Sequence, residues 1–244
     1  MIYAYRSDTG LRKHNEDSFY VPEEGRIPVV IVADGMGGHQ AGEVASSMAI
    51  DIITRYVDTA EVGGGSITLL RQAVNEANKR IFDLAMTDDR CTGMGTTVVM
   101  ALLERDKYTV ANIGDSRLYH YDGQKLRRIT RDHSYVQELI SSGLITEEQA
   151  KDHPQRNLVT RAVGTSRFEK ADVGVKSWAE GDILLLCSDG LCGSVDDIDM
   201  ERLLRSGNDL LTCCDMLVEL ALRCGSTDNI SVVLVQNEGV NGRA

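Results

Sequence analysis

The sequence predicts an α+β fold, in which helices pack on the outside of antiparallel β-sheets. Strand-like apolar runs follow one another with only short turns between them, which is typical of antiparallel pairing. The helical patterns occur in groups and do not alternate strictly with the strands, which argues against a parallel α/β sheet. The chain has 244 residues, of which 42% are hydrophobic, so one large domain or two small ones can bury a core without disulfide bonds or a structural metal.

Helices are expected where apolar residues recur at helical spacing, over residues 44–56, 70–85 and 210–221. Gly225 follows the last of these and is typical of a helix C-terminus. Strands are expected at the apolar runs 28–33, 96–104, 108–113, 117–121, 125–129, 182–187 and 230–235. Asp122-Gly123 lies between two of these runs and predicts a hairpin turn.

The charge balance and the apolar runs indicate a compartment and exclude some partners. With 26 Lys+Arg against 37 Asp+Glu, the net charge of −11 argues against nucleic acid or an anionic membrane as a general partner. The N-terminus lacks the apolar run of a signal peptide, and the longest such run, Val98–Leu103, is far short of the ~18 residues that span a bilayer. The six cysteines lack Cys-x-x-Cys spacing, as expected of reduced thiols. We therefore expect a cytoplasmic protein.

One polar, helix-prone insertion, residues 132–161, interrupts the strand-rich region. Thr146 and Gln149 within it have the spacing of a helix capping box. The insertion is therefore predicted to form a surface subdomain or lid.

Several nucleophilic and cofactor-binding motifs are absent from the sequence. No cysteine is followed six positions later by Arg, which excludes the phosphate-binding loop of Cys-nucleophile phosphatases. Neither a P-loop nor a Gly-x-Ser-x-Gly elbow occurs. The five histidines lack His-Glu-x-x-His spacing, so a zinc hydrolase site is not expected.

What remains is a set of carboxylates beside the predicted strands. They are Glu16, Asp17, Asp34, Asp115, Asp189 and Asp228. Each aspartate alone fits an ordinary turn, as Asp122 does. Asp34 and Asp189, however, end fully apolar runs, where an unpaired carboxylate is costly unless a cation neutralises it. Oxygen ligands without Cys or His indicate a hard cation, Mg²⁺ or Mn²⁺.

Two other residues accompany these carboxylates. Gly35 follows Asp34 and would let a backbone carbonyl approach an ion. Arg12 lies five residues before Asp17 and carries a guanidinium suited to bidentate phosphate binding. A solvated surface arginine is the alternative interpretation of Arg12.

These residues belong to seven short blocks that lie between residues 7 and 235. The blocks are Arg12-x-x-Asn15-Glu16-Asp17, Ala33-Asp-Gly-Met-Gly-Gly-His-x-x-Gly-Glu43, Gly93-Met-Gly-Thr-Thr97, Ala111-Asn-Ile-Gly-Asp-Ser-Arg117, Asn157-x-x-Thr160-Arg-Ala-x-Gly164, Cys187-Ser-Asp-Gly-Leu191 and Ser226-Thr-Asp-Asn229. In content and order they resemble the metal-dependent protein phosphatase family (PPM, protein phosphatase type 2C), in its compact bacterial form. The resemblance implies a single domain over residues 1–244, folded as a four-layer αββα sandwich of two antiparallel sheets flanked by helices. Residues 132–161 match the family's flap, which borders the active site.

The resemblance also implies a centre of two Mn²⁺ or Mg²⁺ ions. Asp34 matches the residue that bridges both ions, and the carbonyl of Gly35 ligates one of them. Asp189 and Asp228 match the ligands of the other.

Four more residues match supporting positions of the family. Glu16 and Asp17 support the centre through metal-bound water. Asp115, together with Asp189, matches a third, weaker metal site of bacterial members. Arg12 matches the phosphate-binding arginine, which makes Arg12 a catalytic residue alongside Asp34 and Asp189.

The implied function is a serine/threonine protein phosphatase, in which a metal-activated water hydrolyses phosphoserine and phosphothreonine without a phosphoenzyme intermediate. Its expected partners are phosphoproteins, including a bacterial-type Ser/Thr kinase that it opposes, and we expect a monomer. Two alternatives stay open: a catalytically inactive phosphatase-like module that binds phosphoproteins, and a phosphatase of small phosphate monoesters.

One departure from the family concerns the general acid. Met36 stands where many eukaryotic relatives carry a histidine proposed for that role. Metal-bound water or His39 would then protonate the leaving oxygen. His39 fits equally well as a structural residue that holds the glycine-rich loop.

Overall fold

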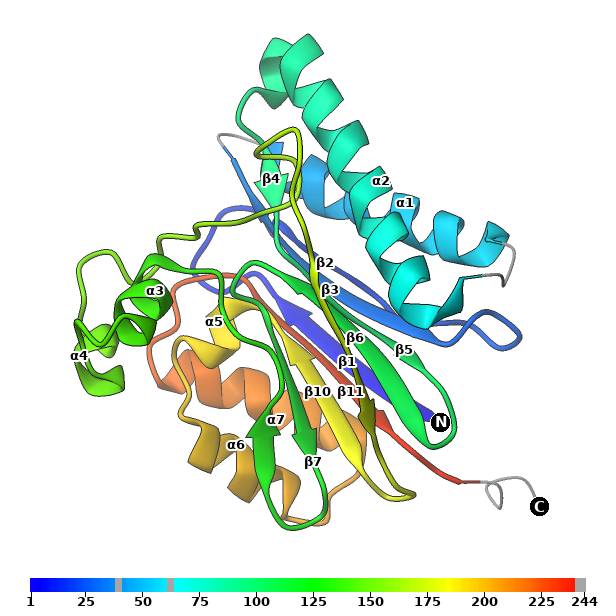
Figure 1. The fold of residues 1–244 in the computed structure, drawn as a ribbon. Coiled ribbons are helices and arrows are strands. Elements are labelled where there is room, and N and C mark those ends of the chain that lie inside the picture. Colours follow the sequence, from blue (N-terminus) through cyan, green and yellow to red (C-terminus); the bar gives the residue numbers. More distant parts are fainter. Residues whose placement is uncertain (38–40, 61–63, 240–244) are drawn as a thin grey trace.

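The computed structural model of the chain describes residues 1–37, 41–60 and 64–239. Within them the strands form two antiparallel sheets (Figure 1). One sheet has the order β1 (Ile2–Asp8), β11 (Ile230–Gln236), β10 (Ile183–Cys187), β7 (Arg117–Tyr121) and β8 (Leu126–Arg128). The other has the order β2 (Asp17–Tyr20), β3 (Val29–Met36), β5 (Val98–Leu103), β6 (Lys107–Ile113) and β9 (Asp172–Ser177), with β4 (Gly95–Thr96) paired to β3.

Alternating side chains explain why the two sheets stack. In β3, Val29, Ile31 and Ala33 pack against the helices outside, whereas Val30 and Val32 face the other sheet. The strands β10 and β11 alternate in the same way between their own helices and the space between the sheets. These central strands are therefore apolar on both faces, as expected of strands covered on both sides.

Helices cover the outer faces of both sheets (Figure 1). The β3 sheet carries α1 (Ala41–Thr59) and α2 (Gly65–Thr87), and the 3₁₀ turn η1 (Asp89–Cys91) leads from α2 to β4. The β10 sheet carries α5 (Asp189–Cys192), α6 (Asp197–Leu204) and α7 (Leu210–Arg223). The four layers are thus helix, sheet, sheet and helix.

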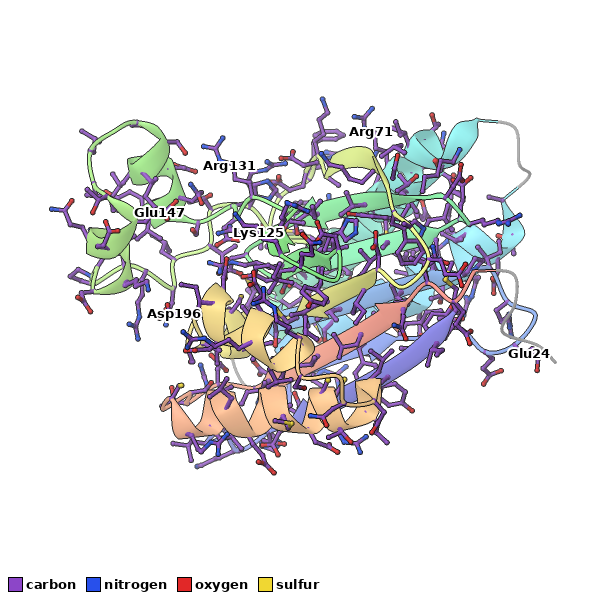
Figure 2. The ribbon with its side chains drawn as sticks, turned by 90° about the horizontal axis from the view of Figure 1, so that it is seen from below. Glu24, Arg71, Lys125, Arg131, Glu147 and Asp196 are labelled. Atoms are coloured by element: carbon purple, nitrogen blue, oxygen red, sulfur yellow. The ribbon has the colours of Figure 1, made fainter. Side chains whose placement is uncertain are left out.

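The flap segment, residues 132–161, holds two short helices, α3 (Tyr135–Ser141) and α4 (Glu147–Lys151). Figure 2 shows Glu147 of α4 on a lobe that projects from one end of the sheets. Thr146 and Gln149 form the predicted capping box at the start of α4. Lys151 Nζ lies 2.5 Å from Oδ1 of Asp196, the residue before α6, so an exposed ion pair joins this lobe to the helical layer.

The predicted α+β class and the four-layer architecture are confirmed. The helices expected at 44–56, 70–85 and 210–221 correspond to α1, α2 and α7, and Asp122-Gly123 turns the β7–β8 hairpin. The strands β1 and β9 and the helices α5 and α6 were not predicted. No helix within the described ranges combines the length and apolar composition that a membrane span requires.

Candidate metal centre

The carboxylates singled out in the sequence come from both sheets. Asp17 and Asp34 are paired across β2 and β3. Asp189 begins α5 directly after β10, and Asp228 lies two residues before β11. Asp115 follows β6 in the turn to β7. Strand pairing within each sheet and stacking of the sheets therefore bring residues from five segments of the chain to one end of the sandwich.

These carboxylates lie close enough together for neighbouring charges to raise their pKa values. Burial, and then the charges of the other four aspartates, raise the pKa of Asp34 well above its ordinary value. Burial raises the pKa of Asp17 to about 7 and that of Asp115 to about 7, with Asp189 the largest charge contribution to each. Burial and the charge of Asp228 raise the pKa of Asp189. Such clustering of carboxylates favours neutralisation by protons or cations.

One hydrogen bond crosses from one sheet to the other at this end. Ser188, which follows β10, donates from Oγ to Oδ2 of Asp17 at 2.7 Å. The same Oγ accepts the backbone N–H of Ser231 in β11 at 3.0 Å. Ser188 thereby fixes the Asp17 carboxylate relative to β11 and to the start of α5, which carries Asp189.

Two glycines allow the backbone segments to meet closely. A Cβ on Gly35 would lie 2.1 Å from the carbonyl oxygen of Gly42, at the start of α1, and 2.6 Å from that of Glu16. A Cβ on Gly190 would lie 2.0 Å from the carbonyl oxygen of Asn229. All three distances are far below a non-bonded carbon–oxygen contact, so the approach of other backbone segments requires glycine at both positions.

The turn before β2 is tied to the turn before β11. Asn229 Oδ1 accepts the backbone N–H of Glu16 at 2.8 Å, and its Nδ2 donates to the carbonyls of Thr9 and His14 at 2.9 and 3.0 Å. Glu16 in turn accepts the backbone N–H of Gly35 through its carbonyl at 3.1 Å. Burial raises the pKa of the Glu16 side chain, which lies half-buried beside this turn.

The donor set fits a hard divalent cation. Asp17 Oδ1 and Asp189 Oδ1 are both buried and have no hydrogen-bond partner in the described part of the chain. No three His, Cys, Asp or Glu side chains among the described residues form a ready-made ligand sphere for one ion. Mg²⁺ commonly takes one or two carboxylates and keeps several waters. The two carboxylates of Asp17 and Asp189, each with one oxygen that lacks a hydrogen-bond partner, suit such an ion.

Arg12 lies at the exposed edge of the same group. Its Nη2 donates to Asp228 Oδ2 at 2.7 Å, and the Arg12 side chain is 57% exposed. The positive charge therefore sits against the acidic residues and remains accessible from solvent. This arrangement suits recognition of an anion that approaches the carboxylate cluster from outside.

The match to known proteins agrees with this geometry. A family model described as protein phosphatase 2C matches residues 8–220. The chain belongs to the protein phosphatase 2C family. The resemblance drawn from the seven sequence blocks is thereby confirmed. The serine/threonine phosphatase stp of Listeria monocytogenes serovar 1/2a is 41% identical over 243 residues, which cover 98% of this chain and 96% of that protein.

Solved structures of serine/threonine phosphatases have the same architecture. The crystal structure of the serine/threonine phosphatase Stp1 from Staphylococcus aureus has a TM-score of 0.91 and 34% identity, covering 97% of this chain and 95% of that one. The catalytic domain of the serine/threonine protein phosphatase PstP, in complex with two manganese ions, has a TM-score of 0.85 and 37% identity, covering 96% and 97%.

Two residues that hold this carboxylate cluster, Ser188 and Asn229, were not singled out in the sequence. Ser188 and Asn229 lie in the quoted blocks next to Asp189 and Asp228, and that adjacency was the available signal. Their partners lie on other strands and turns, so their roles emerge only from the tertiary structure. Met36 ends β3 and is half-buried, whereas His39 lies outside the described residues.

Proposed function

We propose that the chain is a metal-dependent serine/threonine protein phosphatase that hydrolyses phosphoserine and phosphothreonine through a metal-activated water, without a phosphoenzyme intermediate. The observation that carries this proposal is the pair of orphaned, buried carboxylate oxygens on Asp17 and Asp189 at the junction of the two sheets. The names of the relatives support the phosphatase activity, and the two manganese ions bound by PstP support metal dependence.

The core ligands in this proposal are Asp34, Asp189 and Asp228, together with the carbonyl of Gly35. Bound Mn²⁺ or Mg²⁺ would supply a water of lowered pKa and neutralise the charge on phosphate. Burial and four neighbouring aspartates raise the pKa of Asp34, so in the absence of a cation its carboxyl favours the protonated form. A cation would favour the ionised form of the same carboxylate.

Glu16, Asp17, Asp115 and Arg12 take supporting roles. Glu16 and Asp17 would orient water around the ions, and Ser188 holds the Asp17 carboxylate by the bond described above. Asp115 would contribute to a third, weaker ion site. Arg12 would bind the phosphate from the exposed side, where its guanidinium is accessible. Positioning and charge neutralisation account for most of the rate enhancement that phosphoryl transfer requires.

The surroundings of the cysteines favour water over a thiolate as the nucleophile. Of the six cysteines only Cys224 is exposed, and it caps the end of α7. Burial raises the pKa of Cys214 to about 12, which keeps this thiol protonated. Cys187 and Cys192, which flank Asp189, are buried.

The natural substrates under this proposal are phosphoserine and phosphothreonine proteins, among them a cognate Ser/Thr kinase that the phosphatase opposes. We further propose that residues 1–244 act as one domain in the cytoplasm, as a monomer. The flap segment, residues 132–161, would form part of the border of the active site.

Hydrolysis of a phosphothreonine peptide with Mn²⁺, with and without EDTA, tests the proposal. Wild type should be active with Mn²⁺ and inactive with EDTA, and Asp189→Ala should lose at least about a hundredfold in kcat, since a metal ligand is removed. Asp122→Ala is the matched control, because Asp122 also precedes a glycine but lies in the β7–β8 hairpin turn. Wild type that binds the peptide without hydrolysing it would favour the inactive binding module. Full activity of Asp189→Ala would refute the ligand assignment.

Asp115 has a separate test. Asp115→Ala should keep tight Mn²⁺ binding, measured by calorimetry, and should slow turnover of the peptide. Turnover equal to wild type at limiting and at saturating Mn²⁺ would remove Asp115 from the mechanism.

A further inference from the structure

His133, near the start of the flap segment, is bonded to the turn that carries Asp115. The backbone N–H of His133 donates to the carbonyl of Gly114 at 2.9 Å. In return, the backbone N–H of Gly114 donates to Nδ1 of His133 at 3.0 Å, in a buried environment. Gly114 thus has both of its backbone polar groups satisfied by one residue that lies 19 positions away in the sequence.

These contacts define the protonation of the imidazole. Because Nδ1 accepts a hydrogen bond from Gly114, the proton of the neutral ring must reside on Nε2. Nε2 lies 3.2 Å from Oδ2 of Asp172 in β9, to which it donates. The side chain of His133 is 7% exposed, whereas that of Asp172 is 62% exposed. The two ring nitrogens therefore have different partners: a buried backbone amide and an exposed carboxylate.

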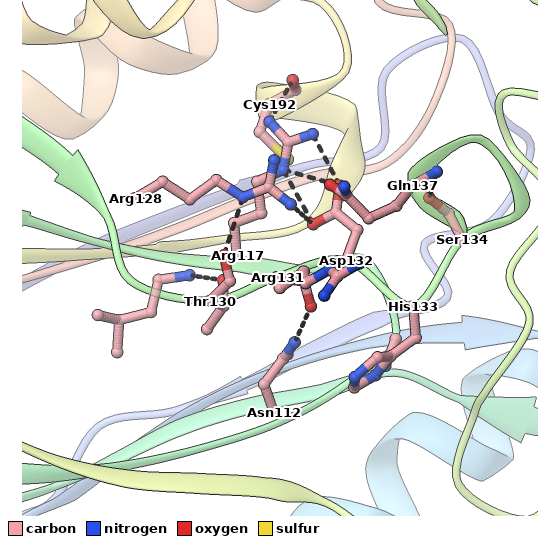
Figure 3. Close-up of polar contacts among 12 residues, drawn as sticks. Asn112, Arg117, Arg128, Thr130, Arg131, Asp132, His133, Ser134, Gln137 and Cys192 are labelled. Carbon is pink, nitrogen blue, oxygen red and sulfur yellow. Dashed lines mark hydrogen bonds and ion pairs between the residues drawn. The ribbon is translucent and has the colours of Figure 1, made fainter. Parts of the chain in front are cut away.

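The flap segment is anchored at Asp132 and at His133 itself. Arg117 in β7 donates from Nε and Nη2 to the carboxylate of Asp132, and Arg128 also pairs with it (Figure 3). The carbonyl of His133 accepts the backbone N–H of Thr160 at 2.8 Å, at the other end of the flap segment. The two ends of this segment therefore meet at His133.

The turn is held from its other side by the sheet that carries Asp34. Ser116 Oγ lies 2.7 Å from Thr97 Oγ1, which accepts the backbone N–H of Asp34 at 2.9 Å. Gly114 has a φ of +104°, and a Cβ there would lie 2.6 Å from the side chain of Thr97. Asp115 is therefore confined between a contact to Asp34 through Thr97 and a contact to the flap segment through His133.

We propose that His133 is a positioning residue that locks the Gly114–Asp115 turn to the base of the flap segment, so that the placement of the Asp115 carboxylate depends on this segment. The inference rests on the proposed function for its catalytic consequence. The two His133–Gly114 hydrogen bonds themselves involve protein groups alone. Displacement of the flap segment by a bound phosphoprotein would reach Asp115 through the two His133–Gly114 hydrogen bonds.

Three substitutions separate the two contacts of the imidazole. Asn at position 133 places an amide oxygen where Nδ1 stands, so His133→Asn retains the acceptor for Gly114 and loses Asp172. His133→Gln reaches toward Asp172 and offers no acceptor at the δ position. His133→Ala loses both contacts. Asp172→Ala removes the partner of Nε2, together with an ion pair to Arg161, and leaves the contact to Gly114 in place, so it serves as the matched control.

Hydrogen–deuterium exchange of the metal-free proteins, followed in peptides that cover residues 112–118, is the first measurement. Exchange at this turn should accelerate about tenfold in His133→Ala and His133→Gln, as expected for loss of one hydrogen bond. It should stay near the wild-type rate in His133→Asn and Asp172→Ala. Equal exchange in all four variants, or no rescue by asparagine, would overturn the lock.

The second measurement is the Mn²⁺ concentration that gives half-maximal hydrolysis of a phosphothreonine peptide. It should rise about tenfold in His133→Ala and His133→Gln, the same factor as the lost hydrogen bond, and return toward wild type in His133→Asn. Unchanged Mn²⁺ dependence in variants whose turn exchanges faster would overturn the link to Asp115. Wild type without Mn²⁺-dependent hydrolysis would refute the proposed function instead, while the exchange rates would still decide whether His133 locks the turn.

Discussion

The Oγ of Ser188 donates a 2.7 Å hydrogen bond to Oδ2 of Asp17, and this bond joins the two sheets where the carboxylates gather. Ser188 follows β10 in one sheet, and Asp17 begins β2 in the other. The other oxygen of Asp17 has no partner within the described residues. The bond from Ser188 therefore orients the carboxylate, and its second oxygen is left available for a cation.

Ser188→Ala tests the importance of that bond. The substitution removes the donor to Asp17 and the acceptor for Ser231 N–H, so it should lower the free energy of unfolding by about 1–3 kcal/mol. Calorimetry should also show weaker Mn²⁺ binding, because Asp17 loses a contact that favours its ionised form. Ser206→Ala, which removes a hydroxyl bonded within the α6 C-terminal turn, is the control. Mn²⁺ affinity equal to wild type in Ser188→Ala would contradict this role.

The raised carboxyl pKa values predict how the metal-free protein responds to pH. Asp17 and Asp115 titrate near 7 in the folded chain, against an ordinary value of 3.8. The folded state therefore binds more protons than the unfolded state between about pH 4 and 7, and stability falls as the pH rises through this range. Thermal unfolding with EDTA should give a lower Tm at about pH 8 than at about pH 5.5.

A variant isolates this effect from other titrating groups. Asp115→Asn should flatten the pH dependence of Tm, because its side chain carries no charge at either pH. An Asp115→Asn profile parallel to that of wild type would mean that Asp115 does not titrate in this range.

Mn²⁺ binding should release protons near neutral pH. Carboxyls with a pKa of about 7 are partly protonated at that pH, and a bound cation drives them to the ionised form. Calorimetric titrations in two buffers of different ionisation enthalpy should reveal this release, which should decline toward about pH 9. Identical binding enthalpies in both buffers near pH 7 would show that the carboxylates are already ionised.

Gly190→Ala should impair the site through the backbone. The added Cβ would lie 2.0 Å from the Asn229 carbonyl oxygen and push α5 away from the turn that carries Asp228. A stability loss of about 1–3 kcal/mol is expected, together with a lower Mn²⁺ affinity. Gly174→Ala is the control, since a Cβ there meets nothing within 4 Å. Wild-type Tm and Mn²⁺ affinity in Gly190→Ala would refute the close approach.

Arg12 should affect substrate binding more than turnover. Arg12→Ala should raise KM for a phosphothreonine peptide about tenfold or more, because a charge-assisted bond to phosphate is lost. Arg12→Lys should recover only part of the lost substrate affinity, since an ammonium lacks the planar pair of N–H donors with which a guanidinium binds phosphate. Lys13→Ala changes an exposed neighbouring cation and should leave KM unchanged. Equal KM values for wild type and Arg12→Ala would leave Arg12 as a partner of Asp228 alone.

The architecture could be predicted from the sequence largely because the central strands are continuous apolar runs. The run that becomes β10 ends at Cys187, and the one that becomes β3 includes Val29–Ala33 before Asp34. Carboxylates at the ends of such strands stand out against their apolar neighbours. Their gathering could therefore be anticipated without knowledge of the topology.

The remaining elements lack such a signal. β9 is an edge strand that is largely exposed and contains Gly174, so it shows no apolar alternation. α5 has four residues, too few to display a helical period. His133 could not be connected with Gly114 from the sequence, because an isolated histidine carries no indication of which backbone amide it will accept.

The position of β11 between β1 and β10 has a consequence for biosynthesis. β11 spans Ile230–Gln236 and pairs along its length with Ile2–Asp8, so β1 lacks its partner strand until residues 230–236 have been made. Asn229, which accepts the backbone N–H of Glu16, directly precedes β11 and is made just before it. A nascent chain still short of this point has neither the complete sheet that contains β1, β11 and β10 nor the complete cluster of acidic residues. We therefore expect phosphatase activity only in chains in which residues 229–236 have left the ribosome.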